Sequence, residues 1–109
     1  MPAVLVAQLD VEVRKRILIV DNEDSVRAVF RRLLEEAGYD TATTWSGIKA
    51  LGLLTSRRFD VVLVDDYLAD VYVGDFLERV WRLRTPPRVV VMQAKPKKIE
   101  VELNIRQCA

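Results

Sequence analysis

Two short, purely aliphatic runs constrain the fold of this chain more than any other feature. They cover residues 17–20 and 61–64, and neither run alternates with polar residues. Runs of this length without alternation are typical of strands buried on both faces, and such strands occur mainly in parallel sheets that helices cover. The sequence therefore predicts a protein of the α/β class.

The segment between these two runs carries first a helix pattern and then a strand pattern. The predicted helix has apolar residues at three- and four-residue spacing, a capping residue in Ser25 or Asp24, and Gly38 at its end. The apolar positions of this helix are Val26, Val29, Phe30, Leu33, Leu34 and Ala37. After the helix, a more polar strand is predicted over residues 39–43.

The rest of the chain continues this alternation. Ser46 is the predicted cap of a short helix, and a third helix has its apolar residues within 76–83 and is stopped by the proline pair that begins at Pro86. Residues 88–93 form the fourth predicted strand. Strands that alternate with helices of this length predict right-handed βαβ units and a doubly wound parallel sheet.

The two ends of the chain have a different pattern. Apolar and polar residues alternate over 9–13 and again over 99–105, which is typical of strands with one face in water. Such strands lie at sheet edges or in antiparallel pairs. A helix over residues 97–107 is the competing interpretation, because Glu and Leu favour helices.

Composition limits the size and the partners of the protein. With 109 residues, half of them hydrophobic, the chain has enough material for one domain with one core. A net charge of +1 gives no general attraction to nucleic acid or to an anionic membrane, so we expect neither as a partner. No apolar run is long enough to span a membrane and no signal peptide is evident, which favours a cytoplasmic location. The single cysteine, Cys108, cannot form an internal disulfide, which also fits a reducing compartment. The absence of histidine excludes histidine metal sites and histidine catalysis.

Two acidic clusters follow the two aliphatic runs directly. The first begins at Asp21 and continues to Asp24, and the second is Asp65 with Asp66. The carboxyl ends of parallel strands meet at one edge of a sheet, where ligands of α/β proteins gather. The sequence therefore predicts a shared acidic site, with a hard cation as its ligand.

Three segments resemble the receiver domain of two-component response regulators, the CheY-like family. They are residues 17–23 (ILIVDNE), 34–39 (LEEAGY) and 59–70 (FDVVLVDDYLAD). The resemblance implies a flavodoxin-like fold in which an aspartate after the third strand accepts a phosphoryl group from a sensor histidine kinase. By this match Asp65 is the phosphoacceptor and Asp66 is the alternative.

The resemblance covers about residues 15–98, which leaves 1–14 as an N-terminal extension and 99–109 as a C-terminal strand or short helix. It also implies a Mg²⁺ site, because an attacking carboxylate needs a cation to neutralise the charge that accumulates between two anions. Asp21, Asn22 and Asp65 are the expected ligands. Lys95, which precedes a proline as the family's lysine does, is the expected phosphoryl contact.

Several positions depart from the family pattern. Asn22 replaces a carboxylate, so we expect weakened Mg²⁺ binding, although the neighbouring Glu23 could compensate with its own carboxylate. Gln93 stands at the switch position, where the family has a hydroxyl. Ala69 replaces a proline, and the loop after Asp65 is one residue longer than usual. A single residue separates Gln93 from the lysine, where the family has a helix and a strand, so the domain is atypical or truncated after its fourth strand.

Three kinds of function can be weighed against these patterns, and the first fits them best. The first is a receiver domain, not an enzyme, that is phosphorylated on Asp65, or a degenerate pseudo-receiver that works through protein contacts or dimerisation. The second, a phosphatase with an aspartyl phosphate, expects an aspartate where Tyr67 stands. The third, a nucleotide- or flavin-binding protein, lacks a glycine-rich loop. We expect a sensor kinase or another signalling protein as partner, and a homodimer held by the terminal strands, because exposed strand edges recruit further strands.

Overall fold

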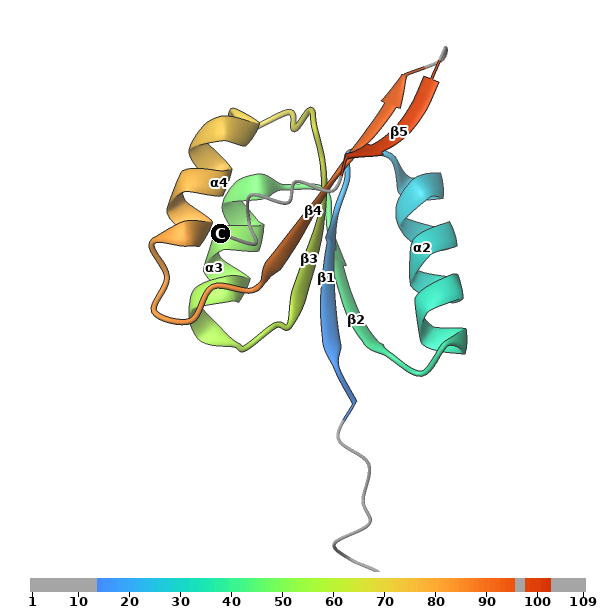
Figure 1. Cartoon of the computed structure of the whole chain (residues 1–109), viewed down its shortest axis with the longest axis horizontal. Helices are drawn as coiled ribbons and strands as arrows, with labels where there is room; N and C mark the ends of the chain where they lie inside the picture. Colours follow the sequence, from blue (N-terminus) through green and yellow to red (C-terminus); the bar gives the residue numbers. More distant parts are fainter. Residues whose placement is uncertain (1–13, 96–97, 103–109) are drawn as a thin grey trace, which may run out of the picture.

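A computed structural model describes residues 14–95 and 98–102. These residues form one five-stranded sheet with the strand order β2-β1-β3-β4-β5 (Figure 1). The strands are β1 (Arg16–Val20), β2 (Asp40–Thr44), β3 (Val61–Asp65), β4 (Arg88–Lys95) and β5 (Lys98–Glu102). The helices are α2 (Asp24–Glu36), α3 (Gly47–Ser56) and α4 (Val73–Trp81).

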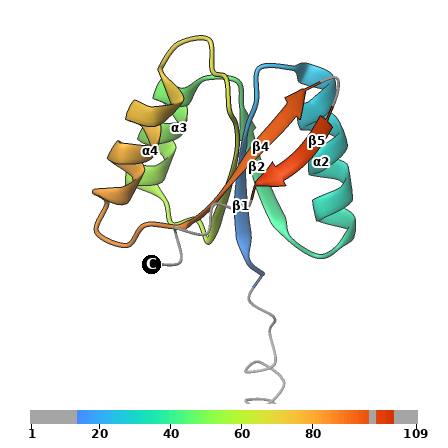
Figure 2. The ribbon, with the colours of Figure 1, turned by 45° about the horizontal axis from the view of Figure 1, so that its top comes forward.

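Strands β1 to β4 are parallel, and β5 is antiparallel to β4. Helices α3 and α4 cover one face of the sheet, and α2 lies on the other, as both ribbon views show (Figures 1 and 2). This arrangement confirms the predicted α/β fold with a doubly wound, flavodoxin-like parallel sheet. The β4–β5 hairpin leaves the sheet toward the side of α2 (Figure 1).

The hydrophobic core lies between the sheet and the pair α3–α4. Six of its side chains, from β1, β3 and α4, are completely shielded from solvent: Leu18, Val20, Val62, Val64, Phe76 and Val80. Burial of one such side chain stabilises the fold by about 1.5–3 kcal/mol relative to its exposure. This packing holds the carboxyl ends of β1 and β3, from which both acidic clusters emerge, in fixed positions.

Two predicted helix ends are confirmed and two are wrong. Ser46 caps α3 by accepting a hydrogen bond from the Lys49 amide, and Gly38 has the positive φ of 98° expected after α2. The predicted caps of α2 are wrong, because Glu23 is its N-cap residue and makes no side-chain cap hydrogen bond. Asp24 is instead inside the first turn, where its carboxylate pairs with Arg27.

The third helix starts and ends earlier than the sequence indicates. It begins at Val73 and ends at Trp81, well before Pro86, so the prolines do not stop it. The amides of Arg82 and Leu83 donate to carbonyls three residues back, and this tighter turn ends the helix.

The predicted C-terminal strand is confirmed for the part that the structure describes. β5 pairs with β4 from Val91↔Glu102 to Lys95↔Lys98, which excludes a helix over these residues. The remainder of that predicted strand, residues 103–105, and the predicted strand over residues 9–13 lie outside the described residues. Where the resemblance implies a further helix and parallel strand, the described residues form a hairpin of β4 and β5.

Candidate functional site

The two key carboxylates lie next to each other at the carboxyl edge of the sheet. β1 and β3 pair in register up to Val20↔Val64, and Asp21 and Asp65 are the next residues on the two strands. Neighbouring strands are about 4.8 Å apart, so these two residues face one crevice. Asp21 is only 5% exposed, and Asp65 is half-buried.

The environment of Asp65 favours its neutral form. Burial and the neighbouring Asp21 carboxylate raise the pKa of Asp65 from 3.8 to about 6, and a hydrogen bond with Asp66 and its charge add to the increase. Repulsion between two carboxylates in one crevice is relieved by a proton or by a cation. The geometry therefore supports the predicted shared acidic site.

The backbone around Asp21 is held by its neighbours. Its amide donates to the Thr44 carbonyl on β2, and its Oδ1 accepts from the Glu23 amide at 2.9 Å. Arg27 Nη1 donates to the Asp21 carbonyl oxygen at 2.6 Å, and the Arg27 side chain is only 16% exposed. Sequence reasoning did not single out Arg27, although its spacing of three residues from Asp24 indicated an ion pair on one helix face.

Asn22 connects the loop after β1 to the loop after β3. Its Nδ2 donates to the Tyr67 carbonyl oxygen at 3.0 Å, and its Oδ1 accepts from the Ala69 amide at 3.2 Å. Both ends of the side-chain amide are therefore engaged with backbone 45 and 47 residues away. A carboxylate has no donor for the Tyr67 carbonyl, so only an amide can make both hydrogen bonds. We call this pair of hydrogen bonds from Asn22 the clamp between the two loops. Asn22 as a cation ligand stays a prediction.

Asp70 holds the same loop from its other end by capping α3. Its carboxylate accepts hydrogen bonds from Ser46 Oγ at 2.6 Å and from the amides of Gly47 at 2.9 Å and Ile48 at 3.2 Å. Burial acts to raise the pKa of Asp70, but these hydrogen bonds outweigh it and the pKa lies below its ordinary value. Sequence reasoning missed this role, because nothing local signals a cap that comes from 22–24 residues away.

Three further predicted residues have defined positions on the strands. Asp65, the last residue of β3, is in register with Met92 of β4, and the Asp66 amide donates to the Met92 carbonyl. Gln93 follows Met92 on β4, so it lies one residue beyond the end of β3. Lys95 lies opposite Lys98 in the hairpin, three residues past Met92, which is about 10 Å along the strand. The contacts of Gln93 and Lys95 with a phosphoryl group stay predictions.

Two features of the described residues bear on a metal ion and on the membrane. Among the described residues, no group of three or more His, Cys, Asp or Glu side chains is placed to hold a metal ion, so a cation here would rest on the two carboxylates and on other oxygen donors. No helix in the same part of the chain is long and apolar enough to cross a membrane.

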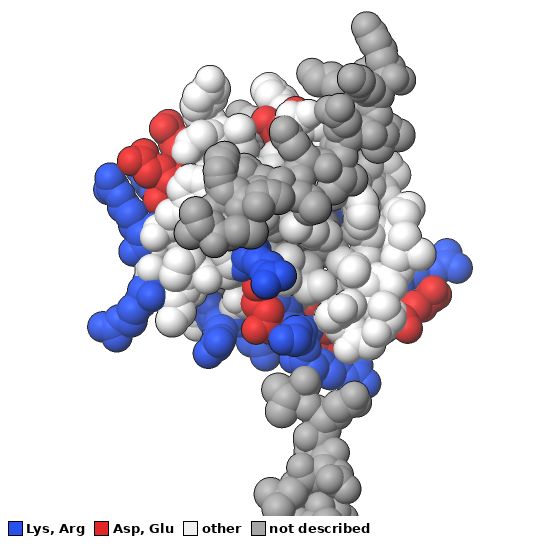
Figure 3. Space-filling model, in the orientation of Figure 1, with Lys and Arg blue, Asp and Glu red and all other residues white. Residues whose placement is uncertain are grey.

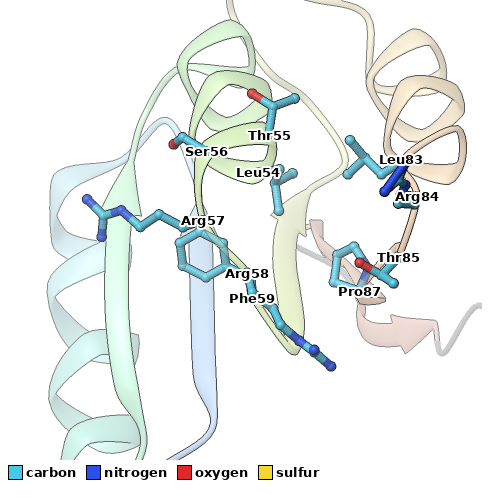
Figure 4. Close-up of a pocket in the computed structure, with 10 residues that line it drawn as sticks. All are labelled: Leu54, Thr55, Ser56, Arg57, Arg58, Phe59, Leu83, Arg84, Thr85 and Pro87. Carbon is cyan, nitrogen blue, oxygen red and sulfur yellow. The ribbon is translucent and has the colours of Figure 1, made fainter.

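The opposite end of the sheet is basic. A hollow of about 360 Å³ lies between the end of α3 and the segment before β4, and the residues lining it include Arg57, Arg58 and Arg84 but no carboxylate (Figure 4). Lys and Arg side chains gather along the corresponding lower edge of the molecule (Figure 3). This hollow is therefore separate from the acidic site.

Comparison with known proteins agrees with the fold. The family model described as response regulator receiver domain matches residues 17–106. The chain belongs to this family. Receiver domains of response regulators accept phosphoryl groups in two-component signalling, and they are signalling modules.

Individual relatives support the same assignment. The chain is 30% identical over 80 residues to sporulation initiation phosphotransferase F of Bacillus subtilis, and the match covers 73% of this chain and 64% of that protein. It is 32% identical over 96 residues to the DNA-binding response regulator MtrA of Mycobacterium tuberculosis, covering 88% of this chain and 42% of MtrA. The chain therefore spans less than two thirds of the length of either relative.

The fold is also shared with solved receiver structures. A receiver domain (CheY-like) from Methylobacillus flagellatus superimposes with a TM-score of 0.72 at 22% identity, covering 84% of this chain and 80% of that one. At this identity the likeness concerns the fold, and the roles of individual residues depend on the site itself.

Proposed function

We propose that this receiver domain accepts a phosphoryl group on Asp65 from a sensor histidine kinase. The observation that carries the proposal is the position of Asp65 beside Asp21 in one crevice. Burial there, together with the charge of Asp21, raises the pKa of Asp65 to about 6. At neutral pH the carboxylate form still dominates, so Asp65 remains a nucleophile. Asp66 is the weaker candidate, because Asp65 is the residue in register beside Asp21.

The site suits Mg²⁺. Mg²⁺ keeps several of its waters and needs only one or two carboxylates, which Asp21 and Asp65 supply. When bound, the ion neutralises charge between the Asp65 carboxylate and the incoming phosphoryl oxygens. Because Asn22 is neutral and engaged with the loop, we expect weak binding, and Mg²⁺ is a weakened cofactor in this proposal.

In the transfer, an Asp65 Oδ forms a bond to phosphorus while the bond between phosphorus and the donor's leaving atom breaks. Asp21 stays in place because its amide donates a hydrogen bond to the Thr44 carbonyl and its carbonyl accepts one from Arg27. The clamp by Asn22 keeps the following loop at a fixed distance from the nucleophile. Gln93 lacks the short hydroxyl of the switch position, so we expect the acyl phosphate to couple poorly to a conformational change.

A second candidate function is that of a phosphorylation-independent module that forms a homodimer. The observation that favours it is the position of β5, which is the last strand in the sheet order and has no further strand beside it among the described residues. Such an edge offers unpaired backbone groups to a strand of a second copy.

The test of the proposed function is the intact mass of the protein after incubation with acetyl phosphate and Mg²⁺. We expect slow, partial addition of one phosphoryl group that disappears in Asp65→Asn and persists in Asp66→Asn. Addition that persists in Asp65→Asn would exclude Asp65 as the acceptor. No addition under any condition would favour the dimerising module.

A further inference from the structure

The hollow between α3 and the segment before β4, called the basic hollow below, gathers cations that have no counter-charge. Arg57, Arg58 and Arg84 line it, and all three are exposed. None of these arginines forms an ion pair with another described residue. Like charges that share a site repel one another, and an anion between them relieves the repulsion. The arrangement therefore indicates an anionic ligand.

Neither the nearest carboxylate in the chain nor the helix ends neutralise these arginines. Asp60 follows Phe59 in the wall of the hollow, but its Oδ2 accepts a hydrogen bond from the Arg16 amide at 2.8 Å, which holds it at the start of β1. The arginines do follow the carboxyl ends of α3 and α4, and each helix end carries about half a negative charge. Two such ends compensate about one positive charge, so most of the arginine charge stays available to a ligand.

The floor of the basic hollow is apolar. Leu54 and Phe59 line it and are 8% and 4% exposed, and the half-buried Leu83 and Pro87 complete this surface. A ligand in the hollow therefore contacts aliphatic and aromatic carbon beside the guanidinium groups. This combination favours a ligand that carries an apolar group next to its acidic group over a simple inorganic anion.

A second hollow of about 390 Å³ adjoins the basic hollow, because Arg57 lines both. In Figure 4 the Arg57 side chain extends away from the other labelled residues toward β2. The second hollow is also lined by Arg14 and Arg16, but Glu35 and Asp40 supply carboxylates there. A uniformly anionic chain such as nucleic acid would be repelled by these two carboxylates. A peptide can instead place neutral residues beside them.

We propose that the basic hollow binds an acidic peptide segment of a protein partner. Arg58 comes from the loop after α3 and Arg84 from the segment before β4, so they line the hollow from opposite sides (Figure 4). A carboxylate of the peptide lies between these two guanidinium groups, which bind carboxylates with paired N–H donors. An adjacent apolar side chain of the peptide contacts Leu54 and Leu83.

The size and the position of the hollow agree with such a ligand. A volume of about 360 Å³ is at the lower end of the range for ligand sites, so the hollow takes a few side chains of an extended segment. The hollow lies at the end of the sheet away from Asp65. The inference therefore does not depend on whether Asp65 is phosphorylated.

The test is fluorescence anisotropy of the full chain with a fluorescein-labelled peptide in which aspartate and leucine alternate. We expect saturable binding that Arg58→Gln and Arg84→Gln each weaken roughly tenfold, because each variant removes a charge-assisted hydrogen bond. Arg32→Gln is the matched control: it removes the same charge from an exposed position on α2, and the affinity should stay unchanged. Unchanged melting temperatures of the variants show that they are folded.

Two further probes separate this ligand from others. A peptide with serine in place of leucine should bind several-fold more weakly, because it lacks the apolar contact. A single-stranded oligonucleotide of equal charge should bind more weakly than the leucine peptide.

Three outcomes overturn the proposal. Equal loss of affinity in Arg32→Gln and Arg58→Gln would reduce the binding to general charge attraction. Equal affinity for the serine and leucine peptides would remove the apolar floor from the recognition. Tighter binding of the oligonucleotide, sensitive to Arg58→Gln and Arg84→Gln, would assign the hollow to nucleic acid.

Discussion

The raised pKa of Asp65 links the stability of the protein to pH. When the pKa of a carboxyl is higher in the folded than in the unfolded protein, protonation of this group stabilises the fold. This stabilisation is fully present below the unfolded pKa and is lost as the pH rises through the folded pKa. For Asp65 this window runs from pH 3.8 to about 6. We expect Asp65→Asn to be more stable than the native protein at pH 7 by roughly 1 kcal/mol without metal, after allowance for solvent screening of a half-exposed group.

The measurement is the free energy of unfolding by urea at several pH values between 4 and 7. The advantage of Asp65→Asn should grow with pH across this window and shrink when Mg²⁺ is added, because the cation relieves the same repulsion. An advantage that does not change with pH would contradict the pairing of Asp65 with Asp21.

Replacement of Asn22 separates its two roles. Asn22→Asp adds a negative charge beside Asp21 and removes the donor to the Tyr67 carbonyl, so Mg²⁺ should bind roughly tenfold more tightly and the metal-free protein should be less stable. Asn22→Ala removes the clamp without adding charge, so it should lose stability and gain no Mg²⁺ affinity. Titration calorimetry with Mg²⁺ distinguishes the two variants, and equal affinities would refute the charge argument.

At the scale of elements, the start of α3 depends on the loop that follows β3. Asp70 supplies a charged cap to that helix from another loop. Asp70→Ala should therefore lower the free energy of unfolding by about 1–2 kcal/mol, as loss of a strong N-cap does. Hydrogen exchange at the Gly47 and Ile48 amides should accelerate in this variant, and unchanged exchange would show that the cap is dispensable.

The pH dependence of this cap has the opposite sign to that of Asp65. Because the folded pKa of Asp70 lies below its ordinary value, its contribution is present above the unfolded pKa and is lost as pH falls through the folded one. Asp70→Asn should therefore cost stability at neutral pH and approach the native protein at strongly acidic pH.

The close approach of α3 to the same loop predicts a contrast between two glycines of one helix. A Cβ at Gly47 would lie 2.3 Å from Val71 Cγ1 and 2.9 Å from Leu68 Cδ1, whereas a Cβ at Gly52 meets nothing within 4 Å. Gly47→Ala should destabilise the protein by about 1–3 kcal/mol through overpacking. Gly52→Ala should stabilise it by up to about 1 kcal/mol through helix propensity. Thermal unfolding of the pair tests this, and equal effects would contradict it.

At the scale of the whole molecule, β5 determines what the free edge of the sheet can bind. We expect the intact chain to be a dimer at micromolar concentration and a version lacking residues 99–109 to be a monomer, because the truncation removes nearly all of the strand that offers its edge. Sedimentation equilibrium of both proteins gives the answer. A monomeric intact chain would rule out the dimer.

The patterns of single segments determined the element types, their order and the parallel sheet. Aliphatic runs, helical spacing and the positions of Ser46 and Gly38 report on local structure, which depends on neighbours within a few residues. The pairing of Asp21 with Asp65 was also predictable, because two strands of a parallel sheet end at the same edge.

Only the tertiary structure decided the partners of Asn22 and Asp70, the hairpin of β4 with β5, and the exposure of Val29 and Leu33. The bonds of Asn22 and Asp70 join residues 22 to 47 positions apart, and their formation depends on the path of the loop after β3. The exposure of α2 depends on what packs beside it. The hydrophobic pattern of a segment shows only which side of a helix or strand is apolar. It therefore predicts neither the path of a distant loop nor whether another element covers that apolar side.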